Sequence, residues 1–70
     1  MVETTPLNRI KVALVERRKT SKWLADTIQK SPTTVSRWAS NKVQPSIEQL
    51  YEIANVLDMD VKDLLTPNKQ

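Results

Sequence analysis

Apolar side chains recur at helical spacing along most of the 70-residue chain, and no stretch shows the alternation of a β-strand. Thr5 followed by Pro6 is typical of an N-cap and a first-turn proline. The spacing after them predicts a helix over about 6–18, with a core-facing side formed by Leu7, Ile10, Ala13, Leu14 and the stem of Arg17. Val12 and Val15 lie partly off that side. We expect them at the edge of the core, with contact to a partner as the alternative.

The middle of the chain predicts two short helices joined by a tight turn. Thr20 can cap a helix over about 21–28, and Ser31 with Pro32 can open another over about 32–38. The core-facing positions of the two helices are Leu24, Ala25, Ile28, Val35 and Trp38. The second helix turns outward or sideways the side chains of Thr33, Thr34, Ser36 and Arg37. Isolated helices below about 12 residues are marginal in water, so packing must hold both.

The rest of the sequence predicts a loop and two further helices. Asn41 is the candidate for a left-handed turn in the loop, because the chain has no glycine. Ser46 can cap a helix whose apolar stripe is Ile47, Leu50, Ala54 and Leu57, flanked by Tyr51 and Ile53. Asp60 can cap a last helix over about 61–65, which ends before Pro67 since a residue preceding proline avoids the helical region.

These elements predict an all-α fold, a compact five-helix bundle. We expect a single domain over residues 1–70 with its core at about 6–65 and flexible ends, and no separate ligand-binding domain. A chain of this length without cysteine lies near the lower size limit for one core, so a dimer interface would add stability.

Composition argues against catalysis. With no Cys and no His, the usual zinc-ligand sets and the common nucleophile–base pairs are missing, so we expect no enzyme, no metal site and no cofactor. Ser21 and Lys22 are adjacent and point in different directions on a helix, which makes them a poor catalytic dyad. We find neither an apolar run long enough for a membrane span nor a signal-peptide pattern after Met1, and therefore expect a cytoplasmic location.

Charge is unevenly distributed along the chain. Residues 9–42 contain nine Lys and Arg against two carboxylates, a net charge of +7, whereas residues 43–70 carry a net charge of −3. The basic part coincides with the two short helices. This pattern favours a polyanion as partner, with an ordinary solvated surface as the alternative.

The polar side of the helix over 32–38 suits the major groove of DNA. Small hydroxyl side chains let a helix approach the bases closely, and Arg37 can pair with a guanine edge. Simple solvent exposure is the alternative for Thr33 and Thr34. For both tryptophans, Trp23 and Trp38, we favour packing over contact with DNA.

Several residues together resemble the lambda-repressor/Cro-type helix-turn-helix domain, also called the XRE family. The similarity covers about residues 7–65. It rests on Leu24-Ala25, Ser31, Thr34-Val35-Ser36-Arg37-Trp38, Lys42, Pro45, Ser46, Leu50, Ile53-Ala54 and Leu57. The resemblance implies a five-helix domain that binds double-stranded operator DNA through the helix from Pro32 to Trp38.

The resemblance also implies roles for individual residues. The positions that usually approach base edges are Pro32, Thr33 and Arg37, with Thr34 and Ser36 as helpers. The phosphate-contacting positions, with Lys22 placed beside them, are Thr20, Ser21, Lys22, Ser40, Asn41 and Lys42. The free amides at the start of the helix over 21–28 suit an anionic oxygen as well.

The sequence departs from the family pattern at a few positions. Ser21 stands where family members commonly have Gln, which braces the second helix and touches the DNA backbone. Gln29 and Asn41 stand where glycine is usual. Asn41 is expected to tolerate a positive φ with modest strain, whereas at Gln29 we expect either a larger strain or a different turn. Leu14 and Ala39 replace an Arg–Glu pair, which we interpret as compatible repacking.

We expect a sequence-specific transcriptional regulator that binds as a homodimer to an inverted repeat, with half-sites about 34 Å apart. The candidate dimer surface is Val56, Met59, Val61 and Leu65, with core packing as the alternative for the last two. Two other functions remain open. One is an antitoxin that binds its operator and a small partner protein, and the other is a helical module that binds protein or RNA.

Overall fold

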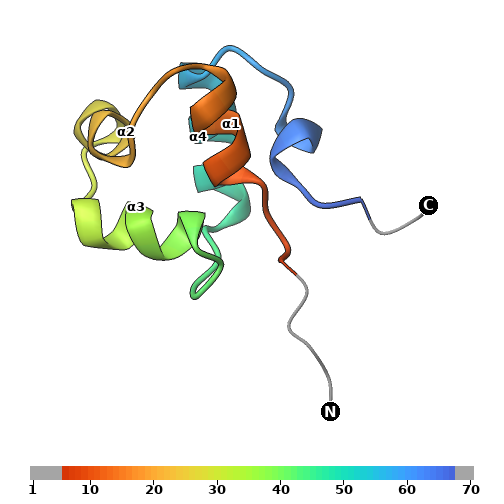
Figure 1. Cartoon of the computed structure of the whole chain (residues 1–70), viewed down its shortest axis with the longest axis horizontal. Coiled ribbons are helices and arrows are strands. Elements are labelled where there is room, and N and C mark those ends of the chain that lie inside the picture. Colours follow the sequence, from red (N-terminus) through yellow and green to blue (C-terminus); the bar gives the residue numbers. More distant parts are fainter. Residues whose placement is uncertain (1–5, 68–70) are drawn as a thin grey trace.

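Four α-helices and one short 3-10 helix make up residues 6–67, the part of the chain that the computed structural model describes (Figure 1). The elements are α1 (Ile10–Glu16), α2 (Ser21–Ile28), α3 (Pro32–Ala39), α4 (Ile47–Val56) and η1 (Val61–Leu64). The all-α class is confirmed, but the last of the five predicted helices is a 3-10 turn. The predicted cap at Thr5 and the predicted flexible ends, residues 1–5 and 68–70, lie outside the described residues. Of the C-terminal end, only Thr66 and Pro67 are described.

Each of the five elements contributes at least one fully buried side chain to a single core. The largest of these side chains are Ile10, Leu24, Val35, Ile53 and Leu64. In Figure 1, α1 and α4 lie between the pair α2 and α3 on one side and η1 on the other. α2 packs against both α3 and α4, while η1 packs against α4 and α1. No helix exceeds 10 residues, so this shared core, more than intrinsic propensity, holds the helices in place.

Four predicted N-caps are present with their hydrogen bonds. The cap oxygen accepts a backbone N–H at 3.0 Å for Thr20 and at 3.1 Å for Ser31, Ser46 and Asp60. Gln49 completes a capping box, because its side chain accepts the N–H of Ser46 at 2.8 Å. Such caps contribute about 1 kcal/mol each. They fix the starts of α2, α3, α4 and η1.

The predicted start of the first helix was wrong, because residues 6–9 are not helical and α1 begins at Ile10. The buried Asn8 holds them in that shape: its amide nitrogen donates to Trp38 O at 2.9 Å and to Gln44 Oε1 at 2.7 Å. Its Oδ1 accepts the N–H of Ile10 at 3.1 Å and so begins α1. The backbone around Asn8 also pairs with the end of η1, through Arg9 N to Leu64 O at 2.7 Å and Thr66 N to Leu7 O at 3.0 Å.

Some predicted core positions are exposed instead. Leu7 is 59% exposed because it belongs to the non-helical segment before α1, and Ile47 is 69% exposed because the buried stripe of α4 begins one turn later, at Leu50. Val12 and Val15, expected at the edge of the core, are exposed as well. The predicted core position Arg17 is also exposed. Its guanidinium donates to the carbonyls of Leu57 at 2.8 Å and Asp58 at 3.1 Å, and so stabilises the end of α4.

All four α-helices end in a left-handed residue that is not glycine. The backbone φ is 59° at Arg18 and Gln29, 63° at Asn41 and 56° at Asp58. The N–H that follows folds back to a helix carbonyl: Lys19 to Leu14 at 2.8 Å, Lys30 to Ala25 at 2.9 Å, Lys42 to Arg37 at 3.0 Å and Met59 to Ala54 at 3.0 Å. This is the Schellman ending, which favours glycine. The expected left-handed turn at Asn41 is confirmed, and Gln29 adopts the conformation usual for glycine.

Gln29→Gly and Asn41→Gly are expected to change stability in opposite directions. At the exposed Gln29, glycine removes a steric cost of about 1–2 kcal/mol in the folded state. It also adds an entropic cost of folding of about 0.5–1 kcal/mol, so the free energy of unfolding should rise slightly. Asn41→Gly brings a smaller relief, because Asn tolerates the left-handed region, and it removes the hydrogen bonds of the Asn41 side chain, so it should lower stability by about 1–2 kcal/mol. Urea unfolding of both variants measures the contrast. A rise for both would contradict a structural role for the Asn41 side chain.

Candidate nucleic-acid interface

α3 turns one side to the core and the other to solvent. Val35 and Trp38 are 0% and 3% exposed, which confirms them as the inward pair. Thr33, Ser36 and Arg37 are exposed, and their spacing places them on one side of the helix. This side therefore presents small hydroxyl groups next to a single guanidinium. Pro32, the other base-contacting candidate, is exposed at the first residue of α3.

Thr34 takes part in the cap of α3. Its hydroxyl accepts a hydrogen bond from Ser31 Oγ at 2.8 Å, and its backbone N–H donates to the same Ser31 oxygen at 3.1 Å. The side chain is half-buried. Thr34 thus helps to fix the start of α3 where the helix follows the turn from α2.

The phosphate candidates come from the start of α2 and from the loop after α3. Lys22 and Lys42 are exposed, whereas Ser21 is half-buried at the first position of α2. The hydroxyl of Thr20 caps α2, and Ser40 Oγ donates to Arg37 O at 3.2 Å. Ser21 and Ser40 border the same surface hollow, so the start of α2 and the end of α3 form one continuous surface.

The side chain of Asn41 is engaged within the protein. Its Oδ1 accepts the backbone N–H groups of Leu7 at 2.9 Å and Asn8 at 3.0 Å, and the amide of Gln44 at 3.1 Å. Its Nδ2 donates to Asn8 O at 3.2 Å. Asn41 therefore shapes the loop beside α3, and its contact with a phosphate stays a prediction.

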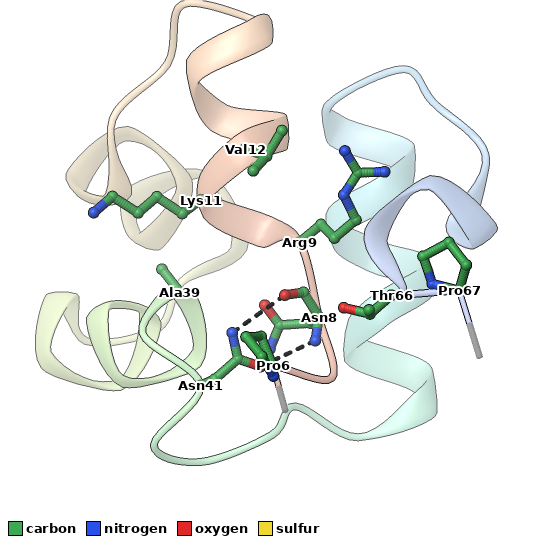
Figure 2. Close-up of a pocket in the computed structure, with 9 residues that line it drawn as sticks. All are labelled: Pro6, Asn8, Arg9, Lys11, Val12, Ala39, Asn41, Thr66 and Pro67. Atoms are coloured by element: carbon green, nitrogen blue, oxygen red, sulfur yellow. Dashed lines mark hydrogen bonds between the residues drawn. The ribbon is translucent and has the colours of Figure 1, made fainter. Parts of the chain in front are cut away.

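Sequence analysis missed the partners of Asn41. Figure 2 shows the hydrogen bonds that join Asn8 and Asn41, beside a hollow of about 360 Å³ that is also lined by Arg9, Val12 and Pro67. Asn8 falls on a polar position of an apparently helical pattern, and Gln44 lies in a polar loop. Periodicity gives no signal for contacts between residues 33 to 36 positions apart.

The positive charge of residues 9–42 lies on the surface of the protein. All nine cationic residues between 9 and 42 are exposed: Arg9, Lys11, Arg17, Arg18, Lys19, Lys22, Lys30, Arg37 and Lys42. The guanidinium of Arg17 is held by α4, and Lys19 Nζ lies 4.7 Å from the centre of the Trp23 ring. Positive charge is left on and beside α2 and α3 by Lys22, Lys30, Arg37 and Lys42, and an anionic partner can approach there.

Three apolar residues that the sequence singled out, Trp23, Leu14 and Ala39, pack against the core. Trp23 is half-buried and packs against the core, which agrees with the preference for packing. Leu14 is buried and Ala39 is half-buried against the same core, as expected for an apolar replacement of an ion pair.

The four candidate residues of the dimer surface are only partly exposed. Val56, Met59 and Val61 are half-buried and pack against the core. Leu65 is 41% exposed and lies in the isolated β-bridge with Asn8. These positions leave some apolar surface near the junction of α4 and η1, and their role in a dimer stays a prediction.

Comparison with known proteins agrees with this geometry. The model of the Cro/C1-type helix-turn-helix DNA-binding domain matches residues 9–70. A crystal structure of a candidate DNA-binding protein from Bacteroides fragilis shares 48% sequence identity, with a TM-score of 0.85 over 86% of this chain and 97% of that one. Comparison with curated protein sequences finds no match. The chain belongs to the Cro/C1-type helix-turn-helix DNA-binding family.

Within residues 6–67, no helix is both long enough and apolar enough to cross a bilayer.

Proposed function

We propose that this chain is a sequence-specific DNA-binding transcriptional regulator that inserts α3 into the major groove. The exposed side of α3 carries this proposal. It combines Thr33, Ser36 and Arg37 on a helix whose buried side, Val35 and Trp38, is fixed in the core. A rigid helix with short side chains can approach base edges closely, and an arginine can donate two hydrogen bonds to guanine O6 and N7.

The surrounding charges support a division between base contacts and phosphate contacts. Arg37, with Thr33 and Pro32, lies on the exposed surface of α3, where base edges would be reached. Lys22 and Lys42 extend from the neighbouring α2 and from the loop after α3, where phosphates would pass. Phosphate contacts position a protein on the duplex, whereas base contacts specify the sequence.

The small size of the domain favours binding as a homodimer to an inverted repeat. One module of this kind buries little DNA surface, so tight specific binding requires two copies on half-sites about 34 Å apart. The candidate surface for pairing is the apolar region of Val56, Met59, Val61 and Leu65, where Leu65 offers the most exposed side chain. Its acidic surroundings in residues 43–70 keep this region away from the polyanion.

Selection from a random duplex pool tests the function. We expect an inverted repeat to be enriched, and fluorescence anisotropy to show binding about 10³-fold or more tighter than to a scrambled duplex of the same length. The comparison should be made at two salt concentrations, because phosphate contacts alone give binding that is weak and lost with salt. If no sequence is enriched and binding has that generic character, the proposed function is wrong and a protein or RNA partner becomes the better hypothesis.

Arg37→Ala and Lys42→Ala should separate specificity from general affinity. Arg37→Ala is expected to cost about 1–3 kcal/mol on the selected duplex and to relax the preference at one base pair. Lys42→Ala should weaken binding to all sequences alike and reduce the salt slope by about one unit. Both residues are exposed, so neither change should unfold the protein. Identical effects of the two substitutions on selected and scrambled duplexes would contradict this division.

A further inference from the structure

A small hollow opens where α1, α2 and α3 meet. Its volume is about 180 Å³, and its lining residues are Lys11 from α1, Ser21 from α2, Ser36 and Ala39 from α3, and Ser40. This volume is several times the roughly 30 Å³ that a water molecule occupies in the liquid, so a phosphate group has room to enter. Four of the five lining side chains carry a hydroxyl or an ammonium group, which is the chemistry that binds phosphate oxygens.

The hollow lies on the side of the molecule that faces the polyanion in the proposed function. Ser36 belongs to the exposed side of α3, Ser40 is the exposed residue that follows α3, and Ser21 is the first residue of α2. Lys11 is exposed, and Figure 2 shows its side chain extending from α1 toward α2 and α3, away from Arg9. A cation from one helix and hydroxyl groups from two others therefore converge on one place.

The short side chain at position 21 leaves this space open. The hydroxyl of Ser40 donates to Arg37 O, so its proton is already engaged within the protein. The hydroxyls of Ser21 and Ser36 are the groups that can turn toward an anion. Thr33 and Arg37, on the same helix as Ser36, do not line the hollow.

We propose that this hollow binds one phosphate group of the DNA backbone, with Lys11 as its cation and Ser21 and Ser36 as hydroxyl donors. The inference rests on the proposed function and changes the part assigned to one residue: Ser36 holds a phosphate and does not contact a base. It also adds Lys11, from α1, to a surface otherwise built from α2, α3 and the loop that follows.

The test uses Lys11→Gln, Ser36→Ala and a control, Lys62→Gln, which removes an equally exposed cation from η1. On the selected duplex, Lys11→Gln should weaken binding about tenfold, as expected for loss of one charge-assisted hydrogen bond. It should also reduce the slope of log K against log salt by about 0.9. Lys62→Gln should leave the slope unchanged. Ser36→Ala should weaken binding to selected and scrambled duplexes by the same factor, with base preference unaltered.

Single methylphosphonate substitutions then locate the contact. At one phosphate in each half-site, the neutral linkage should weaken binding of the wild type but not of the Lys11→Gln variant. At every other phosphate, the linkage should affect both proteins equally. Wild-type affinity and slope for Lys11→Gln, or a changed base preference for Ser36→Ala, would overturn the inference while the proposed function stands. If the wild type prefers no sequence but Lys11→Gln still lowers the slope on random duplex, the sequence-specific function fails and the phosphate site stands.

Discussion

The side chains of Asn8 and Asn41 connect segments on which the rest of the domain depends. Asn8 is the one polar residue buried within residues 6–67, and its amide joins the end of α3 to the loop before α4. Asn41 holds the backbone of Leu7 and Asn8 from the other side. A buried polar group left without its partner costs about 1–3 kcal/mol, a large share of the stability of a small domain. The position of α3 is therefore tied to the start of α1 and to the end of η1.

This connection matters for function because the helix that would contact DNA cannot hold itself. α3 has eight residues and is kept in place by its cap at Ser31 and by its buried pair, Val35 and Trp38. Its end is fixed by Asn41, whose left-handed backbone costs energy that its side-chain hydrogen bonds offset. A helix fixed at both ends loses little further freedom on binding, and so presents Thr33 and Arg37 in a constant arrangement.

Local chemistry could be predicted from the sequence, and distant contacts could not. The caps at Thr20, Ser31, Ser46 and Asp60 were predictable because each depends on residues two or three positions away. The start of α1 was not, since Asn8 bonds to residues 30 or more positions away. The last helix is a 3-10 turn because Leu65, next in line, pairs with Asn8. In the candidate site, the outward side of α3 followed from periodicity, whereas the structural part of Asn41 and the hollow beside Lys11 required the packing of helices.

The central claim is that α3 contacts bases in the major groove. Methylation interference on the selected duplex tests it most directly, because guanine N7 lies on the major-groove edge and is the atom an arginine would contact. The account predicts that a methyl group on N7 of at least one guanine in each half-site blocks binding, at positions related by the symmetry of the repeat. Binding that tolerates N7 methylation of every guanine, alone or together, would contradict it and would place the protein on the backbone or in the minor groove.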